Sequence, residues 1–118
     1  LPLDVQPEYV RRALEAGKHV LSEKPISAMC EAGRALADSY NTTFKAAGLH
    51  WSVAENYRYE GGFVAAAEAV RAGRVGPLIM LELAVHSPMN AGNRFYQTAW
   101  RQNPSWYGGF FQDGAVHF

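Results

Sequence analysis

Asp113 and His117 lie four residues apart, a spacing that suits acid–base chemistry. If the segment GAVHF, residues 114–118, begins a helix, both side chains lie on one helix face and reach the same substrate group. Histidine changes its charge near neutral pH, and a carboxylate beside it would orient the ring and favour its charged form. The alternative is an aspartate that caps the helix beside an incidental histidine.

Lys24 is a further candidate because it follows a predicted strand. The short segment 18–22 lies between Gly17 and Pro25, which bound a strand, and Pro25 keeps Lys24 out of the helical conformation. In doubly wound sheets, ligands gather outside the carboxyl ends of the strands. An ammonium group there could hold a phosphate, a ribose hydroxyl or a substrate oxygen, and the plainer interpretation is a solvated lysine.

Four other side chains are candidates for binding. Asn56 and Arg58 follow a second predicted strand, residues 49–53, so the same end-of-strand argument applies to them. Their plainer interpretation is a turn amide and a surface arginine. Trp100 and Arg101 offer a stacking face and a fork of hydrogen-bond donors.

Composition excludes several classes of function. The 11 basic and 11 acidic side chains cancel, so charge gives no reason to expect a nucleic acid or a membrane surface as a partner. No apolar run approaches the roughly 20 residues of a membrane helix. The lone cysteine, Cys30, forms no internal disulfide and indicates no metal site, and we expect it to be a small buried residue. We expect a soluble, cytoplasmic protein.

The elements that must position these residues follow one another in the order helix, strand, helix, strand. Apolar spacing predicts a helix over 7–16, a strand over 18–22, a second helix that Ser27 caps and that continues to Phe44, and a strand over 49–53. With short links, this order is typical of a parallel sheet covered by helices on both faces. The predicted fold class is α/β.

The pattern changes near residue 55, where we place a boundary between one domain, residues 1–55, and another, residues 56–118. Apolar residues from Phe63 to Val70 mark a third helix, and residues 78–86 form a long, nearly continuous apolar strand. The chain does not begin with Met and stops within an apolar stretch, so we expect a segment of a longer protein.

Several motifs resemble, in order and spacing, the family of glucose-fructose oxidoreductase, inositol dehydrogenase and rhizopine-catabolism proteins (Gfo/Idh/MocA). These motifs are LP at 1–2, ALEAGKHVLSEKP at 13–25, NYRY at 56–59 and GGFFQDGAVHF at 108–118. The run WRQNPSWYGGF is most similar to the fungal branch. The resemblance implies the C-terminal portion of a Rossmann-type dinucleotide-binding domain over residues 1–55, followed by the start of an α+β catalytic domain with an open sheet.

The resemblance also implies roles for individual residues. Lys24 of the EKP motif would contact the nicotinamide ribose and assist proton transfer, His117 would be the acid/base, and Asp113 would bind or orient substrate. The implied cofactor-binding residues are Pro2, Glu23, Lys24, Pro25 and Asn56. The implied substrate-binding residues are Arg58, Trp100, Arg101 and Asp113, and no metal ion is implied.

The activity implied by the resemblance is hydride transfer between NAD or NADP and a hydroxyl or carbonyl carbon of a sugar, polyol or dihydrodiol. A homo-oligomer through the C-terminal sheet is implied as well. The glycine-rich pyrophosphate turn, G-x-G-x-x-G, does not occur in these 118 residues. Two alternatives stay open, a glycoside-cleaving enzyme that uses NAD transiently and a non-enzymatic dinucleotide-binding regulator. The presence of Lys24, Asp113 and His117 together favours an enzyme, since a sensor needs no proton-transfer set.

Overall fold

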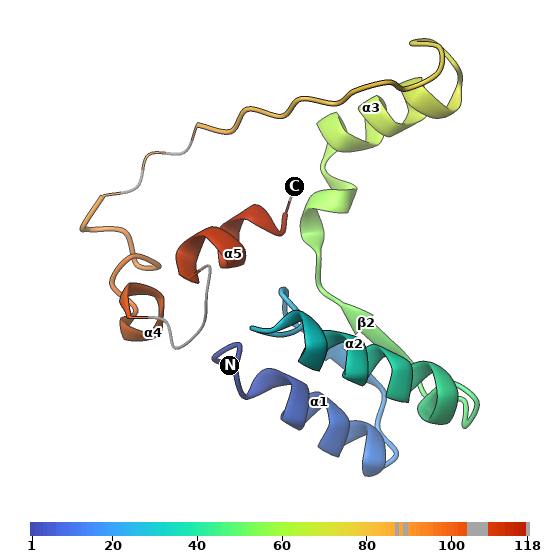
Figure 1. Cartoon of the computed structure of the whole chain (residues 1–118), viewed down its shortest axis with the longest axis vertical. Helices are drawn as coiled ribbons and strands as arrows, with labels where there is room; N and C mark the ends of the chain where they lie inside the picture. Colours follow the sequence, from blue (N-terminus) through green and yellow to red (C-terminus); the bar gives the residue numbers. More distant parts are fainter. Residues whose placement is uncertain (87, 89, 104–108, 118) are drawn as a thin grey trace.

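A computed structural model of the chain describes residues 1–86, 88, 90–103 and 109–117 (Figure 1). Its amino-terminal part is an α/β unit in the predicted order. The elements are α1 (Gln6–Glu15), β1 (Val20–Ser22), α2 (Cys30–Ser39), the π-helical turn η1 (Tyr40–Phe44) and β2 (Trp51–Val53). β1 and β2 run parallel, with Leu21 opposite Ser52. The predicted α/β fold class is confirmed.

The first helix shows why this sequence folds as it does locally. Pro7 lies in the first turn of α1, where its missing N–H costs nothing. Val10 and Leu14, four residues apart, are both buried on the same side of the helix. The chain then leaves the helix through Gly17, whose φ of 72° is a left-handed conformation that glycine adopts without strain. This stop allows β1 to start three residues later.

The core of the α/β unit lies between the two helices and one face of the sheet. Val10 and Leu14 of α1 pack with Leu36 of α2, and all three side chains are buried. Partly buried apolar side chains pack around them: Val20, Tyr40, Phe44, Leu49 and Trp51. The indole N–H of Trp51 donates a hydrogen bond of 2.9 Å to Ser22 Oγ, across the two strands. This packing holds the carboxyl end of β1, where the chain continues to Lys24.

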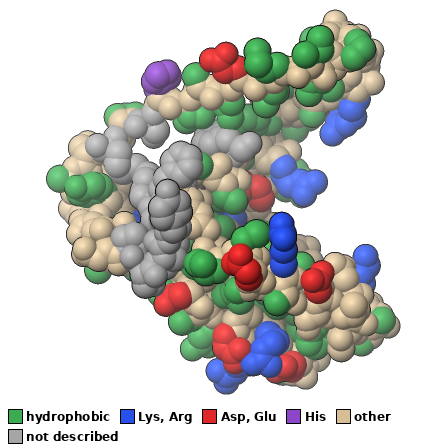
Figure 2. Space-filling model, viewed as in Figure 1, with side chains coloured by type: hydrophobic (Ala, Val, Ile, Leu, Met, Phe, Trp, Pro, Cys, Tyr) green, Lys and Arg blue, Asp and Glu red, His purple; other side chains and the backbone are tan. Residues whose placement is uncertain are grey.

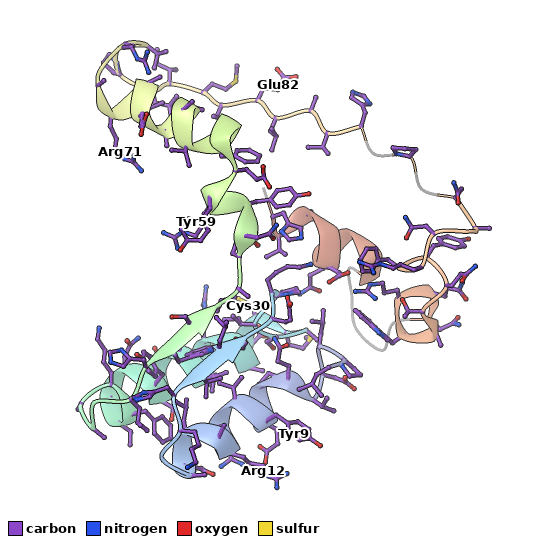
Figure 3. The ribbon with its side chains drawn as sticks, turned by 180° about the vertical axis from the view of Figure 1, so that it is seen from behind. Tyr9, Arg12, Cys30, Tyr59, Arg71 and Glu82 are labelled. Atoms are coloured by element: carbon purple, nitrogen blue, oxygen red, sulfur yellow. The ribbon has the colours of Figure 1, made fainter. Side chains whose placement is uncertain are left out.

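Both helices lie on the same face of the sheet, as the front view of Figure 1 and the rear view of Figure 3 show. Leu21, on the other face, is 74% exposed. The prediction of helices on both faces is therefore wrong for the described part of the chain. The physical reason is that α1 and α2 share one apolar core and so occupy the same side of the strands.

The start of α2 also differs from the prediction. Ser27 does not cap the helix: its hydroxyl pairs with the backbone N–H and carbonyl of Met29 in a local turn, and the helix begins only at Cys30. Cys30 is exposed rather than buried, because the buried face of α2 is formed by Gly33 and Leu36. The expectation of a small buried residue at position 30 is thus wrong.

The remainder of the chain is more open. It contains a 3₁₀ turn η2 (Asn56–Tyr59), α3 (Gly61–Arg71), α4 (Ala99–Gln102) and α5 (Gly109–Ala115). The predicted third helix is confirmed as α3. The radius of gyration is 17.2 Å, against about 13 Å for a compact domain of this length. No helix in the described ranges is long and apolar enough to cross a membrane.

Residues 78–86 are extended but pair with no other strand in the described part of the chain. Ile79 is 97% exposed and Met80 is 79% exposed. The predicted strand is therefore not formed, although the backbone is extended. A strand exists only where a neighbouring strand accepts and donates its backbone hydrogen bonds, and apolar composition alone does not supply that neighbour.

The buried core of the α/β unit predicts the effect of one pair of leucine substitutions. Leu14→Ala is expected to lower the free energy of unfolding by about 2–5 kcal/mol, because it removes a fully buried side chain and leaves a cavity. Leu21→Ala removes the same atoms from an exposed position. It is expected to change the free energy of unfolding by less than about 0.5 kcal/mol. Urea unfolding followed by circular dichroism measures both. Equal losses would contradict this placement of the core.

Candidate active site

A cavity of about 1250 Å³ lies where the carboxyl end of β1 meets α4 and α5. Figure 2 shows the molecule hollowed between the α/β unit and the extended arm that carries α3. The volume exceeds the roughly 300–1,000 Å³ of most small-molecule sites, so more than one small ligand has room there. Seven of the predicted site residues line it: Pro2, Glu23, Lys24, Trp100, Arg101, Asp113 and His117.

Lys24 reaches across the cavity to the second half of the chain. Its Nζ donates hydrogen bonds to the backbone carbonyl of Asp113 at 2.6 Å and to Asp113 Oδ1 at 3.1 Å. The two residues lie 89 positions apart in sequence. The ammonium group therefore links the end of β1 to α5, and the end-of-strand argument places it correctly at the cavity.

The side chain of Gln6 forms hydrogen bonds to the backbone of the loop that carries Lys24. This side chain is only 3% exposed, and its amide Nε2 donates to the carbonyls of Glu23 at 2.7 Å and Pro25 at 2.6 Å. The peptide bond between Lys24 and Pro25 is cis. These two hydrogen bonds, one buried and one partly buried, fix the backbone on either side of Lys24, so the position from which its side chain extends is defined.

Asp113 is buried in the middle of α5 and forms ion pairs with two positively charged side chains. Lys24 contacts Oδ1, and Arg101 Nε donates to Oδ2 at 2.7 Å. α5 begins at Gly109, so Asp113 does not cap a helix that starts at GAVHF, as the alternative interpretation held. Both carboxylate oxygens therefore already have charged donors, which is how a buried carboxylate is stabilised.

Arg101 lies close to two aromatic rings. Its guanidinium carbon lies 3.9 Å from the centre of the Trp100 ring and 5.2 Å from that of Phe95, and Nη1 donates to Thr98 Oγ1 at 2.9 Å. Stacking and hydrogen bonding together orient the planar group toward Asp113. The predicted stacking face and donor fork thus lie side by side on the cavity wall.

His117 does not pair with Asp113, contrary to the sequence expectation. α5 ends at Ala115, so the helical spacing of four residues is not maintained up to His117. Its Nδ1 lies 2.8 Å from Glu55 Oε1, and its ring stacks on Tyr57 with centroids 4.3 Å apart and planes 24° apart. The carboxylate beside the histidine is therefore supplied by the segment after β2.

Glu55 is a site residue that the sequence reasoning missed. Its Oε1 also accepts the backbone N–H of Tyr57 at 3.0 Å. Burial acts to raise the pKa of Glu55, but the hydrogen bonds from His117 and Tyr57 and the charges of His117 and Lys24 outweigh it, so the pKa lies below its ordinary value. This contact stabilises the fold above the ordinary carboxyl pKa, and the contribution is lost as pH falls through the lowered value.

The sequence did contain a signal for Glu55, namely its position directly after β2. Residues at the end of a parallel strand are candidate site residues, and this holds for Glu55 as well as for the residues that follow it. Asn56 and Arg58, which the end-of-strand argument selected, do not line the cavity. Glu55, which caps the 3₁₀ turn, and Tyr57 within it are partly buried, whereas Asn56 and Arg58 are exposed. Arg58 lies over the ring of Tyr59 instead. Figure 3 shows Tyr59 pointing away from α5.

One further predicted site residue, Pro25, lies beside the cavity rather than in its lining. It is buried in the loop after β1. Gly108 and Phe118, at the two ends of the motif at 108–118, lie outside the described residues. Within the described ranges, no group of three or more His, Cys, Asp and Glu side chains is arranged to hold a metal ion.

Comparison with known proteins gives a consistent assignment. Residues 1–49 match the model of the oxidoreductase family with an NAD-binding Rossmann fold, Gfo/Idh/MocA. Dehydrogenase FPY6 of Fusarium mangiferae is 36% identical over 115 residues, which are 97% of this chain and 32% of that protein. The chain is Gfo/Idh/MocA-like.

Two other comparisons extend over nearly the whole chain. Protein YMR315W of Saccharomyces cerevisiae is 32% identical over 117 residues, 99% of this chain and 32% of that protein. The crystal structure of an oxidoreductase from Thermotoga maritima matches with a TM-score of 0.79 and 30% identity, over 99% of this chain and 35% of that one. The chain thus spans about a third of the length of these relatives.

These findings confirm the family resemblance and the Rossmann-type α/β fold. They also confirm that the Gfo/Idh/MocA family is one of NAD-binding oxidoreductases, which makes NAD or NADP the expected cofactor. Two of the relatives are fungal, as the similarity of the WRQNPSWYGGF run indicates.

Proposed function

We propose that this chain joins the end of a dinucleotide-binding domain, residues 1–55, to the start of a catalytic domain, residues 56–118, in a larger NAD(P)-dependent oxidoreductase, called the whole enzyme below. The contact between Lys24 and Asp113 carries this proposal. It brings the lysine of the EKP motif and the Asp-x-x-x-His motif to one cavity, one from each side of the proposed boundary. The reaction is the oxidation of a CH–OH group of a sugar, polyol or dihydrodiol, or the reverse reduction.

The residues at the carboxyl end of β1 suit the nicotinamide and ribose end of a dinucleotide. Pro2, Glu23 and Lys24 line the cavity there, and Lys24 supplies an ammonium group whose side chain is 15% exposed. Such groups can hydrogen-bond ribose hydroxyls at the edge where parallel sheets bind ligands. A dinucleotide bound there would supply the hydride acceptor or donor.

The chain's own residues move the proton and orient the substrate. His117 accepts the hydroxyl proton in the oxidation and returns it in the reduction. Lys24 donates a hydrogen bond at the reacting oxygen and assists this transfer. Trp100 and Arg101 hold the rest of the substrate against the opposite wall, so that the reacting carbon is fixed before hydride transfer.

To test the reaction class, the whole enzyme is supplied with NAD or NADP and a panel of sugars, polyols and dihydrodiols, and reduced nicotinamide and products are measured. One reduced nicotinamide is expected for each oxidised hydroxyl. Cleavage of a glycoside without net reduction would establish the transient use of NAD instead. Dinucleotide binding without turnover of any compound would favour the regulator.

The isolated 118-residue chain is expected to bind NADH or NADPH only weakly, with no saturation in the micromolar range. The sequence has no G-x-G-x-x-G turn, so the backbone donors that hold a pyrophosphate are missing whatever Lys24 contributes. Titration followed by nicotinamide fluorescence measures this, with Lys24→Ala as the matched control. A micromolar Kd that Lys24→Ala abolishes would contradict the prediction.

A homo-oligomer formed through the sheet of the catalytic domain is part of this proposal. Residues 78–86 would form part of that sheet, because in the described part of the chain they are extended, apolar and paired with no strand. In the whole enzyme, their neighbouring strand belongs to the rest of the sheet, whose outer face then contacts the second copy.

A further inference from the structure

We propose that Glu55 is the positioning residue for His117, holding the proton on Nδ1 so that Nε2 carries the lone pair for proton transfer. This inference rests on the proposed function, because it gives His117 the acid–base step. It assigns to Glu55 the part that the sequence reasoning gave to Asp113.

The geometry fixes His117 in two independent ways. Stacking on Tyr57, with planes 24° apart, sets the plane of the imidazole ring. The 2.8 Å contact between Nδ1 and Glu55 Oε1 sets the rotation of the ring within that plane. With both constraints in place, the position of Nε2 is determined.

Glu55 is itself held as an acceptor. The backbone N–H of Tyr57 can only donate, and it donates to the same Oε1 atom that contacts His117. An acceptor oxygen fixed by a backbone donor favours the histidine tautomer with its proton on Nδ1. Tyr57 thus contributes twice, through its backbone to Glu55 and through its ring to His117.

The carboxylate of Glu55 keeps its charge at neutral pH. The groups that face Glu55 are the imidazole of His117, the ammonium of Lys24 and the backbone N–H of Tyr57. All three favour the ionised form of the Glu55 carboxyl group. The side chains of Glu55 and His117 are only 22% and 17% exposed, so water competes weakly for the contact. A charged, partly buried acceptor is a stronger constraint on a ring than a neutral one.

Asp113 does not position His117, because both of its carboxylate oxygens already accept hydrogen bonds from positively charged side chains. Oδ1 accepts from Lys24 and Oδ2 accepts from Arg101. The site therefore has two separate carboxylates with two separate tasks. Asp113 positions Lys24 and the arginine, and Glu55 positions the histidine.

The direct test is the tautomer of His117, read from the ring nitrogen chemical shifts of the whole enzyme labelled in histidine. His117→Ala assigns the signal by removing it. The parent protein is expected to show the proton on Nδ1 when the ring is neutral. Glu55→Ala is expected to shift the ring toward the Nε2–H form that free imidazole side chains favour. An unchanged tautomer in a folded Glu55→Ala protein would overturn the inference.

Glu55→Gln covers the case in which Glu55→Ala does not fold, since it keeps volume and shape. Its amide can donate as well as accept, so a mixture of tautomers is expected, and retention of pure Nδ1–H would count against a role for the charge. Glu68→Gln, at an exposed position on α3, is the matched control and should leave the tautomer as in the parent.

Kinetics then separate this inference from the proposed function. Glu55→Ala is expected to lower kcat about tenfold to a hundredfold with little change in KM, because a histidine that is no longer positioned transfers the proton less well while the substrate contacts remain. If the tautomer shifts but neither Glu55→Ala nor His117→Ala changes kcat, the positioning contact is real and the acid–base function is wrong. If His117→Ala lowers kcat and Glu55→Ala changes neither tautomer nor kcat, only the inference fails.

Discussion

The His117→Ala substitution is expected to lower kcat of the whole enzyme about a hundredfold or more, the usual contribution of a positioned acid or base. The ring lines the cavity and is held by Glu55 and Tyr57. Its loss removes the group that exchanges the hydroxyl proton, while binding of the cofactor is left intact. Steady-state kinetics with saturating cofactor measure the effect.

His50→Ala is the control for this experiment. His50 is exposed on the α/β unit and does not line the cavity, so kcat is expected to stay near the parental value. If folded His117→Ala protein keeps its parental kcat across neutral pH, the acid–base assignment is wrong. His117 would then serve only to pack against Tyr57 near the end of α5.

Lys24→Ala is expected to lower kcat by a similar factor, about a hundredfold or more, since it removes the ammonium group that assists proton transfer. Its effect on stability is expected to be smaller than that of a fully broken ion pair, because Arg101 still binds the carboxylate of Asp113. Kinetics on cofactor-saturated enzyme, with a thermal melt of each variant, measure the two effects separately.

Lys18→Ala and Asp113→Asn complete the comparison. Lys18 is exposed in the turn before β1, so its loss should change neither kcat nor stability noticeably. Asp113→Asn removes the charge that holds Lys24 and Arg101 but keeps the size, and a higher KM is expected. A parental kcat for folded Lys24→Ala would show that the lysine only supports the structure.

The α/β unit could be predicted because local signals and packing agree there. Pro7 at the start of α1 and Gly17 after its end bracket a helix whose buried residues are spaced four apart. Pro25 marks the end of β1 in the same way. These signals act within a few residues, so they can be read without knowing the tertiary structure.

The segment at 78–86 and the pairing of the carboxylates could not be predicted, for a shared reason. Whether an apolar segment becomes a strand depends on a neighbour distant in sequence. Which carboxylate meets His117 depends on where α5 ends and on how the chain turns after β2. Spacing along a single helix suggested Asp113, whereas the contact comes from Glu55, 62 residues away.

The contact between Lys24 and Asp113 also makes the two sides of the cavity energetically interdependent. The ammonium of Lys24 is shared between Asp113 and any ligand that it binds at the end of β1. A ligand that accepts a hydrogen bond from Lys24 therefore weakens the contact between Lys24 and Asp113. This changes the electrostatic environment that a second ligand meets at Asp113. Thermodynamic linkage requires the reverse effect to have the same size. We therefore expect cofactor and substrate affinities in the whole enzyme to be coupled by an equal factor in both directions.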